Sequence, residues 1–470
     1  MTTIQEDGSR RFLHPAAVGG RFTMARRLVA YMLILLFVLI PWIQVSGRPA
    51  VFLDLGSLRF HFFGFTLLAE EFWILFFCLT GFGFLLFFIT AILGRVWCGW
   101  ACPQTVFLEH LFRRIEAFID GNPKQRRALE NSPWTDKRKI LKRVLKHGIF
   151  LFLCVVIAHL VLAYFVSIPR LYGWVKGSPE DHLSAFLFIV FFSGILYFNF
   201  AWFREQLCLA ICPYGRLQSA LIDDHSLIIG YDEKRGEPRG RANDPANGDC
   251  INCYRCVEVC PTGIDIRQGL QIECIGCANC IDACDEVMRK IDRPEGLVRY
   301  DSLNGFAGKK TLWLRPRILF YLFMGMLGAS AFAYAATTLR PELMVVGRAP
   351  GSSYYVDEGG VRNHFRVRIF NKLDAGRVFS LEVEDLASSG LYLAGEDQTV
   401  EVPPMGEVSR LVVVQVPFES FSASKLSFEM VVRAADGRSG EMRERLEFLG
   451  PNPELLREDF KVDQRTGGRE

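Results

Sequence analysis

The chain has 470 residues, which is long enough for two or three domains. Half of the residues are hydrophobic, aromatic residues reach 13%, and phenylalanine alone occurs 40 times. The net charge of +3 favours no class of partner, but the 22% of residues that are charged are unevenly distributed along the chain. This distribution argues against a wholly soluble protein.

Five long stretches contain no charged residue. They cover residues 28–45, 72–93, 148–168, 183–203 and 318–339. A charge at the centre of a bilayer costs about 2.5–3.5 kcal/mol, so five charge-free stretches of spanning length predict five transmembrane helices rather than buried helices of a soluble protein. The first stretch is too long for the core of a signal peptide, contains Pro41 and lacks a small-residue cleavage site, so we expect it to remain as a span.

Lysine and arginine are concentrated in some of the connecting segments. Residues 1–27 contain five and residues 94–147 contain twelve, whereas residues 46–71 and 169–182 contain two each. The positive-inside rule therefore predicts that the N-terminal tail 1–27, residues 94–147 and residues 204–317 are cytoplasmic, and that the chain beyond the fifth span is not. The basic run beside the third span is interpreted as a topology signal or a contact with anionic lipid, not as a nucleic-acid site.

The segments after the fourth span predict two further domains. The membrane region, residues 28–228, holds four spans, and residues 229–249 have the Gly, Pro, Asn and Asp content of a linker. Residues 250–290 are dense in cysteine and are expected to form a ferredoxin-like domain. Residues 340–470, on the far side of the fifth span, are expected to form an all-β domain without disulfides, because no cysteine follows Cys284.

Alternating apolar and polar residues in this last domain predict β-strands. The runs are 364–370, 378–384, 399–403, 409–416 and 425–433. In the first of them Phe365, Val367 and Ile369 are expected on one face, with Arg366 and Arg368 on the other. About seven such strands in this length are typical of an immunoglobulin-like sandwich.

The most specific motif is a pair of cysteine runs with the spacing of bacterial two-cluster ferredoxins. The runs are Cys250, Cys253, Cys256 and Cys260, then Cys274, Cys277, Cys280 and Cys284. In this pattern the fourth cysteine of each run binds the other [4Fe–4S] cluster. We assign to the first cluster Cys250, Cys253, Cys256 and Cys284, and to the second Cys260, Cys274, Cys277 and Cys280. Structural zinc usually has two ligand pairs set farther apart, and disulfides are disfavoured in a reducing compartment.

A second cysteine motif occurs twice. "CGWACP" follows the second span and "CLAICP" follows the fourth, so that Cys98 and Cys208 are separated by 110 residues, as are Cys102 and Cys212. This spacing predicts a parallel internal repeat that brings both pairs to one face of the membrane.

These four cysteines, the membrane-edge quartet, are candidate copper ligands. The prolines that follow Cys102 and Cys212 favour the first turn of a helix, whose dipole favours thiolate over thiol. Four soft sulfur atoms suit Cu(I), which makes Cys98, Cys102, Cys208 and Cys212 a candidate copper-reduction site. The alternative is that these small thiols only pack at a tight turn.

Two further features bear on the membrane region. Residues 105–119 are predicted to form an amphipathic helix along the interface. Its apolar side is expected to hold Phe107, Leu111, Ile115 and Phe118, and its polar side Arg113, Arg114 and Glu116. His159 lies inside the third span, where a histidine is a weak candidate for a metal ligand or proton relay. No second histidine lies in a predicted span, so bis-histidine haem is not expected.

The combination of CxxxCP pairs, "YDEKRGEPRG", the double cysteine run, a final span and a β-rich end resembles one family over nearly the whole chain. It is similar to the cytochrome c oxidase accessory proteins of the CcoG (FixG/RdxA) family, which are polyferredoxin-type membrane proteins. The CxxxCP pairs alone are less specific, because membrane proteins of the NapH and NosR type also have them.

The resemblance implies a bacterial inner-membrane protein with cupric reductase activity that serves assembly of the cbb-type cytochrome c oxidase. Copper chaperones or an exporter, oxidase assembly factors and an unidentified cytoplasmic electron donor are then the expected partners. Two alternatives remain at this point: a NapH-like quinol dehydrogenase module, and a non-enzymatic scaffold that senses redox state. Steady copper reduction would favour the cupric reductase over the scaffold, and oxidation of quinol without copper would favour the dehydrogenase.

Overall fold

The computed structural model describes residues 12–454, except 46, 243, 245, 358, 374, 387–388, 396–397 and 437–440. The beginning of the predicted tail 1–27 and the end of the predicted domain 340–470 thus lie outside the described residues. The chain divides into two units, Met1–Ala336 and Thr337–Glu470, and each has its own hydrophobic core.

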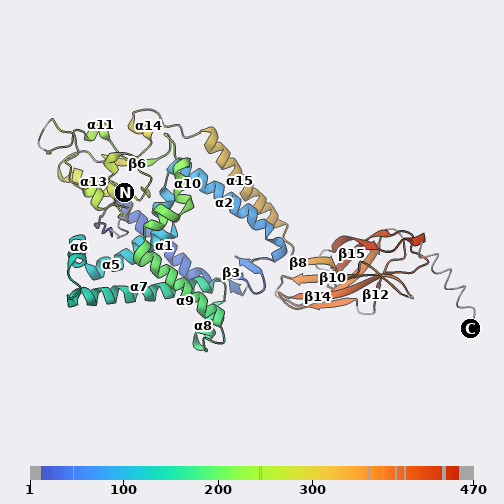
Figure 1. The fold of residues 1–470 in the computed structure, drawn as a ribbon. Coiled ribbons are helices and arrows are strands. Elements are labelled where there is room, and N and C mark those ends of the chain that lie inside the picture. The colour runs from blue at the N-terminus through green and yellow to red at the C-terminus, as the bar shows by residue number, and fades with distance from the viewer. Residues whose placement is uncertain are drawn as a thin grey trace, which may run out of the picture. The chain divides into compact units, whose positions relative to one another are not determined.

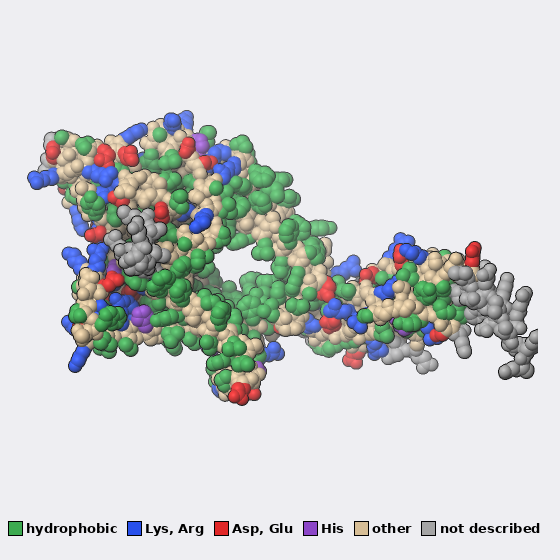
Figure 2. All heavy atoms as spheres, in the orientation of Figure 1, with side chains coloured by type: hydrophobic (Ala, Val, Ile, Leu, Met, Phe, Trp, Pro, Cys, Tyr) green, Lys and Arg blue, Asp and Glu red, His purple; other side chains and the backbone are tan. Residues whose placement is uncertain are grey.

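Within the described residues, five helices of the first unit are long and apolar enough to cross a membrane, as the charge-free stretches predict. They are α1 (Arg21–Leu39, with a 3-10 turn to Trp42), α2 (Trp73–Leu93), α7 (Lys137–Ala163), α9 (Leu183–Phe198, with a π-helix to Phe203) and α15 (Pro316–Thr337). In Figure 2 hydrophobic side chains cover α2 and α15, while charged side chains gather toward the end of this unit that holds the cysteine runs. Helix α7 starts earlier than predicted because the basic run from Lys137 to Lys146 forms its first turns.

Short elements connect the spans. Before α2 these are β1 (Gln44–Val45), β2 (Arg48–Pro49), β3 (Val51–Asp54), β4 (Arg59–Phe62), β5 (Phe65–Leu67) and the 3-10 helix Ala69–Glu71. Between α2 and α7 lie α3 (Val96–Trp100), α4 (Pro103–Phe107), the π-helix Leu108–Phe112, α5 (Arg113–Asp120) and α6 (Pro123–Asn131). Helix α8 (Ile168–Lys176) precedes α9, and the π-helix Leu207–Ile211 and α10 (Pro213–Leu221) follow it. Helices α7 and α9 lie side by side (Figure 1).

The ferredoxin-like domain extends beyond the predicted limits 250–290. Its elements are β6 (Ile228–Tyr231), α11 (Glu233–Gly236), α12 (Arg255–Glu258), the 3-10 helix Ile266–Gln268, α13 (Asn279–Lys290), β7 (Val298–Asp301) and α14 (Leu303–Phe306). Strand β6 pairs antiparallel with β7 and is buried along its whole length. The first residues of the predicted linker 229–249 therefore belong to the core of this domain, because Ile229 and Tyr231 pack against the cysteine-bearing segments.

The second unit consists of two antiparallel sheets. One has the order β12 (Tyr392–Ala394), β14 (Glu407–Val416), β10 (Gly360–Asn371), β8 (Glu342–Arg348), with β9 (Tyr355–Asp357) also paired to β10. The other has the order β13 (Thr399–Val402), β11 (Arg377–Asp385), β15 (Lys425–Ala434), β16 (Met442–Leu449). Phe365, Val367 and Ile369 are buried as predicted, and Phe365 meets Phe428 of the other sheet with ring centroids 5.4 Å apart.

Candidate redox centres

The two cysteine runs of the ferredoxin-like domain have the same local backbone. Each run turns into a short helix through a left-handed residue, Tyr254 (φ 57°) before α12 and Ala278 (φ 60°) before α13. The two positions occupy the same place in the two runs. The turn therefore directs successive cysteines of each run toward a common space.

The structure gathers the eight cysteines of the two runs around two cavities. One is lined by Cys250, Cys253, Cys256 and Cys284, and the other by Cys260, Cys274, Cys277 and Cys280, with Cys256 between the two. These are the two sets that the sequence assigns to the two clusters. Four thiols around each cavity, with apolar walls that include Ile264, Ile266 and Met288, fit a [4Fe–4S] cluster in each.

Cationic side chains flank both cavities. Burial raises the pKa of Cys277 to about 12 and that of Cys274 to about 11, while Arg26 and Arg95 act in the opposite direction. Arg26 donates from Nη1 to the Cys277 carbonyl at 3.4 Å, and Arg267 lies near Cys256 of the first cavity. These guanidinium groups favour the anionic thiolates that a bound cluster requires.

The membrane-edge quartet lies just after the ends of two membrane helices, one in each copy of the repeat. Gly94 (φ 58°, ψ −132°) ends α2, and Arg204 (φ 50°, ψ −119°) ends the π-helix after α9, so the same unusual turn stands four residues before each cysteine pair. Cys102 and Cys212 are the residues that precede α4 and α10, each followed by a proline in the first turn. The predicted repeat thus extends to the backbone.

The structure brings the four cysteines of the quartet together. The Cys208 thiol interacts electrostatically with the thiols of Cys98, Cys102 and Cys212, and the Cys98 thiol donates to Gln218 Oε1 at 3.2 Å. Burial raises the pKa of both Cys98 and Cys208 to about 12. The bias toward thiolate was expected for Cys102 and Cys212; it is wrong for Cys102, because burial raises the pKa of its thiol although the backbone amides of Thr105 and Gln104 at the start of α4 act in the opposite direction.

No group of three or more Cys, His, Asp or Glu side chains in the described residues is already close enough to hold one metal ion, and this includes the quartet. His159, the weak candidate in α7, is bonded through Nδ1 to the Val155 carbonyl one turn earlier, at 2.8 Å. Single-ion binding by the quartet therefore requires its side chains to close around the ion.

The quartet contacts the second cluster site through α3. A Cβ placed on Gly99, next to Cys98, would lie 2.6 Å from the Ile275 carbonyl oxygen and 2.9 Å from the Cys277 amide nitrogen. The backbone of α3 therefore touches the second-cluster loop, which we define as residues 274–277. This close approach places the two predicted sites next to each other.

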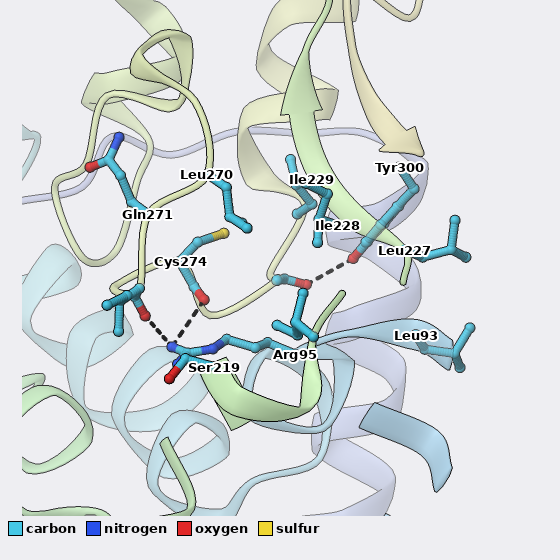
Figure 3. Close-up of a pocket in the computed structure, with 13 residues that line it drawn as sticks. Leu93, Arg95, Ser219, Leu227, Ile228, Ile229, Leu270, Gln271, Cys274 and Tyr300 are labelled. Carbon is cyan, nitrogen blue, oxygen red and sulfur yellow. Dashed lines mark hydrogen bonds between the residues drawn. The ribbon is translucent and has the colours of Figure 1, made fainter. Parts of the chain in front are cut away.

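Arg95 joins the same elements and was not predicted from the sequence. Its guanidinium donates to the carbonyl oxygen of Cys274 at 3.5 Å (Figure 3). It also donates to the carbonyl oxygens of Ile272 and of Gly215, which belongs to α10. The Tyr300 hydroxyl donates to the Gly276 carbonyl at 2.8 Å. A lone arginine directly after a span carries no signal beyond the positive-inside rule, so a local pattern could not assign it this role.

Arg95 and Cys274 also line an apolar cavity of about 270 Å³ at the end of α2 (Figure 3). Its walls include Leu93, Ile228 and Ile229, together with Ser219 of α10. Cys274 and Ile229 line the second cluster cavity as well. The apolar cavity is therefore separated from the second cluster site only by shared side chains.

Three family models match the chain. A 4Fe-4S binding domain matches residues 74–124, a 4Fe-4S dicluster domain matches residues 203–303, and an Ig-like fold at the C-terminal of FixG matches residues 332–451. The first match covers Cys98 and Cys102, and the second covers both ferredoxin runs.

Curated relatives match most of the chain. The nitrogen fixation protein FixG of Rhizobium meliloti is 33% identical over 90% of this chain and 90% of its own length. Protein RdxA of Cereibacter sphaeroides is 33% identical over 85% of this chain and 88% of its own. Among solved structures, a FixG-related protein from Vibrio parahaemolyticus aligns with 24% of this chain and 97% of its own, at 16% identity and a TM-score of 0.21.

The fold and the cysteine sites define an iron–sulfur electron-transfer protein with five apolar helices and a C-terminal Ig-like domain. The chain belongs to the FixG family, which includes RdxA and RdxB.

Proposed function

We propose that this protein is a membrane-bound oxidoreductase that reduces Cu(II) to Cu(I) at the membrane-edge quartet, in support of cbb-type cytochrome c oxidase assembly. The observation that carries the proposal is the contact between α3 and the second-cluster loop, where Gly99 leaves no room for a side chain. When bound, the two clusters supply electrons one at a time. Each Cu(II) gains one electron, and Cu(I) is the state that thiolates prefer.

In this proposal the quartet binds the copper ion and the surrounding residues orient the thiols. Gln218 accepts the hydrogen bond from Cys98, and Arg95 fixes the second-cluster loop against α10. Because the buried thiols of Cys98 and Cys208 are protonated before copper binds, binding releases their protons to solvent. The residues thus accept the ion, keep it beside the cluster site and exchange protons for it.

The proposal also includes an orientation of the protein in a bacterial inner membrane. The lysine and arginine distribution favours a cytoplasmic N-terminus and ferredoxin-like domain, with the Ig-like domain in the periplasm. A cytoplasmic electron donor would reduce the clusters, and copper chaperones or an exporter would carry Cu(I) to the oxidase. We assign the Ig-like domain a docking role toward assembly factors.

The test uses Cys102→Ser and Cys212→Ser, with Cys78→Ser as the control. Cys78 lies in α2, is exposed and does not belong to the quartet. We expect both quartet variants to lose Cu(I) binding and Cu(II) reduction while they keep the full cluster absorbance, since serine is a hard, weak ligand for Cu(I). Wild-type copper reduction by both variants would move the copper site elsewhere.

A second candidate function, oxidation of a membrane quinol, is favoured by the apolar cavity beside Cys274. A quinol headgroup that enters beside Leu93, at the end of α2, would lie next to the second cluster site. Oxidation to the quinone releases two protons to solvent and two electrons, one for each cluster. Ser219→Phe fills this cavity, whereas the neighbouring Ala220→Phe does not, because Ala220 does not line it. Loss of quinol oxidation in the first variant alone, with copper absent, would support this function.

A further inference from the structure

A second large cavity borders α13 of the ferredoxin-like domain and is lined by basic side chains. Its volume is about 350 Å³, and it is open to solvent and bordered by the segment before α1, the start of α1, the π-helix Leu108–Phe112, α5, α6 and the start of α13. Six of the residues that line it carry basic groups: Arg26, Arg27, His110, Arg113, Arg114 and Arg126. Glu109 is the one acidic residue among those that line the cavity.

Several of these groups have a buried nitrogen that bonds to nothing within the described part of the chain. They are the Nε atoms of Arg26, Arg27 and Arg113 and the Nδ1 atom of His110. Arg26, Arg113 and His110 are only 2%, 6% and 7% exposed. A buried donor without a partner costs about 1–3 kcal/mol, and more if it is charged, so the three guanidinium Nε donors favour an acceptor from outside the described residues, whereas Nδ1 of the neutral His110 ring is not counted as a donor.

The positive charge of the cavity is only partly neutralised. Arg113 pairs with Glu109 and with Glu205, the latter at 3.0 Å. Arg26 instead donates to a carbonyl and to Asn279 Oδ1 at 2.7 Å, which are neutral acceptors. The excess charge is felt by His110: burial together with Arg26, Arg114 and Arg27 lowers the pKa of His110 to about 3, so its ring adds no further charge.

We infer that this cavity binds a phosphate-bearing anion. Several oxygen atoms on one tetrahedral group can accept from several guanidinium nitrogens at once, which is why arginine clusters select phosphate. The volume leaves room for a phosphate group and part of the molecule that carries it. The same chemistry is offered by the headgroup of an anionic phospholipid and by a soluble phosphate ester.

The position of the cavity gives the bound anion a role near the redox sites. Arg26 bonds both to the Cys277 carbonyl, in the second-cluster loop, and to Asn279, the first residue of α13. An anion on Arg26 would therefore reduce the positive potential that this side chain presents to the second cluster. Occupancy of the cavity is thus coupled to the electrostatics of that site, independently of which substrate the protein reduces or oxidises.

The test measures binding of inorganic phosphate to the full-length protein in neutral detergent by calorimetry. The variant is Arg114→Gln, and the matched control is Arg127→Gln, which removes the same charge from an exposed position that does not line the cavity. Loss of one charge-assisted hydrogen bond should weaken phosphate binding about tenfold or more in Arg114→Gln and leave it unchanged in the control. Arg27→Gln serves as a second variant if Arg114→Gln does not fold.

Nanodiscs of two compositions distinguish the two sources of phosphate. If an anionic headgroup is the ligand, phosphatidylglycerol nanodiscs will suppress binding of added phosphate and phosphatidylcholine nanodiscs will not. If a soluble ester is the ligand, phosphate will bind equally in both. Absence of phosphate binding in detergent and in phosphatidylcholine, or equal weakening by Arg114→Gln and Arg127→Gln, would overturn the inference.

Discussion

Gly99 shows how one missing side chain can join two sites. Its φ is in the ordinary helical range of α3, so the requirement for glycine comes from the second-cluster loop and not from the backbone of the helix. The loop has a matching close approach, since a Cβ on Gly276 would lie 3.0 Å from the Arg95 carbonyl oxygen. Gly99 faces the backbone of the loop and Gly276 faces the backbone of Arg95 and Val96, so the two glycines together allow the cysteine loop and α3 to touch.

Gly99→Ala should therefore disturb the second cluster site. A new Cβ within 3 Å of backbone atoms forces the loop to move, which costs about 1–3 kcal/mol. We expect a changed electron paramagnetic resonance signal from one cluster and slower copper reduction, with the other cluster unaffected. Gly83→Ala in α2 is the control, because a Cβ there meets nothing within 4 Å. Equal spectra for both variants would mean that α3 does not press on the loop.

Among the elements, α5 differs most from its prediction. The expected polar side of the helix, with Arg113 and Glu116, is buried, while Phe118 on the expected apolar side is 92% exposed. Glu116 bonds to Lys146 of α7 at 3.1 Å and to Arg204 at 3.0 Å. The amphipathic pattern identified the helix and part of its buried face, since Phe107, Leu111 and Ile115 of the expected apolar side pack against the core. Burial of the polar side was not predicted, because the partner charges are distant in the sequence and only packing brings them together.

Across the first unit, groupings set by spacing along the chain were predicted from the sequence, whereas contacts set by tertiary packing were not. Spacing alone grouped the ferredoxin cysteines into the two sets that line the two cavities. The 110-residue interval predicted the repeat that brings Cys98 and Cys208 together. The contact of Gly99 with the cysteine loop and the bridging role of Arg95 depend on tertiary packing, for which neither residue has a local signal.

The buried network around Glu116 should make the protein sensitive to acid. Burial opposes ionisation of Glu116, but Arg204 and Lys146 outweigh it and hold its pKa well below the ordinary value of 4.5. A carboxyl whose pKa is lowered by folding stabilises the protein above its unfolded pKa, and this stability is lost as the pH falls below about 4.5 toward the folded value.

Glu116→Gln should remove this stabilisation at neutral pH. The buried Arg204 then loses its carboxylate partner and Lys146 keeps only Asp120, at 2.9 Å, which costs about 3–5 kcal/mol, and the melting temperature should fall markedly at pH 7 and less at pH 4. Glu286→Gln, which breaks the exposed pair with Lys290, should change the stability by no more than about 1 kcal/mol. Thermal unfolding in detergent measures both, and equal small effects would show that the network is not a stabilising element.

At the scale of the whole molecule, the orientation in the membrane decides whether the proposed chemistry is possible. The twelve basic residues of segment 94–147, against two in each of segments 46–71 and 169–182, predict that the N-terminus and the ferredoxin-like domain are cytoplasmic. A reporter active only outside the cytoplasm should be on when fused after residue 345, beyond α15, and off when fused after residue 290. Both fusions should give full-length protein of equal abundance, which serves as the control. The reverse pattern would place eight cluster cysteines in an oxidising compartment, where such thiols form disulfides, and would rule out the proposed route of electrons to copper.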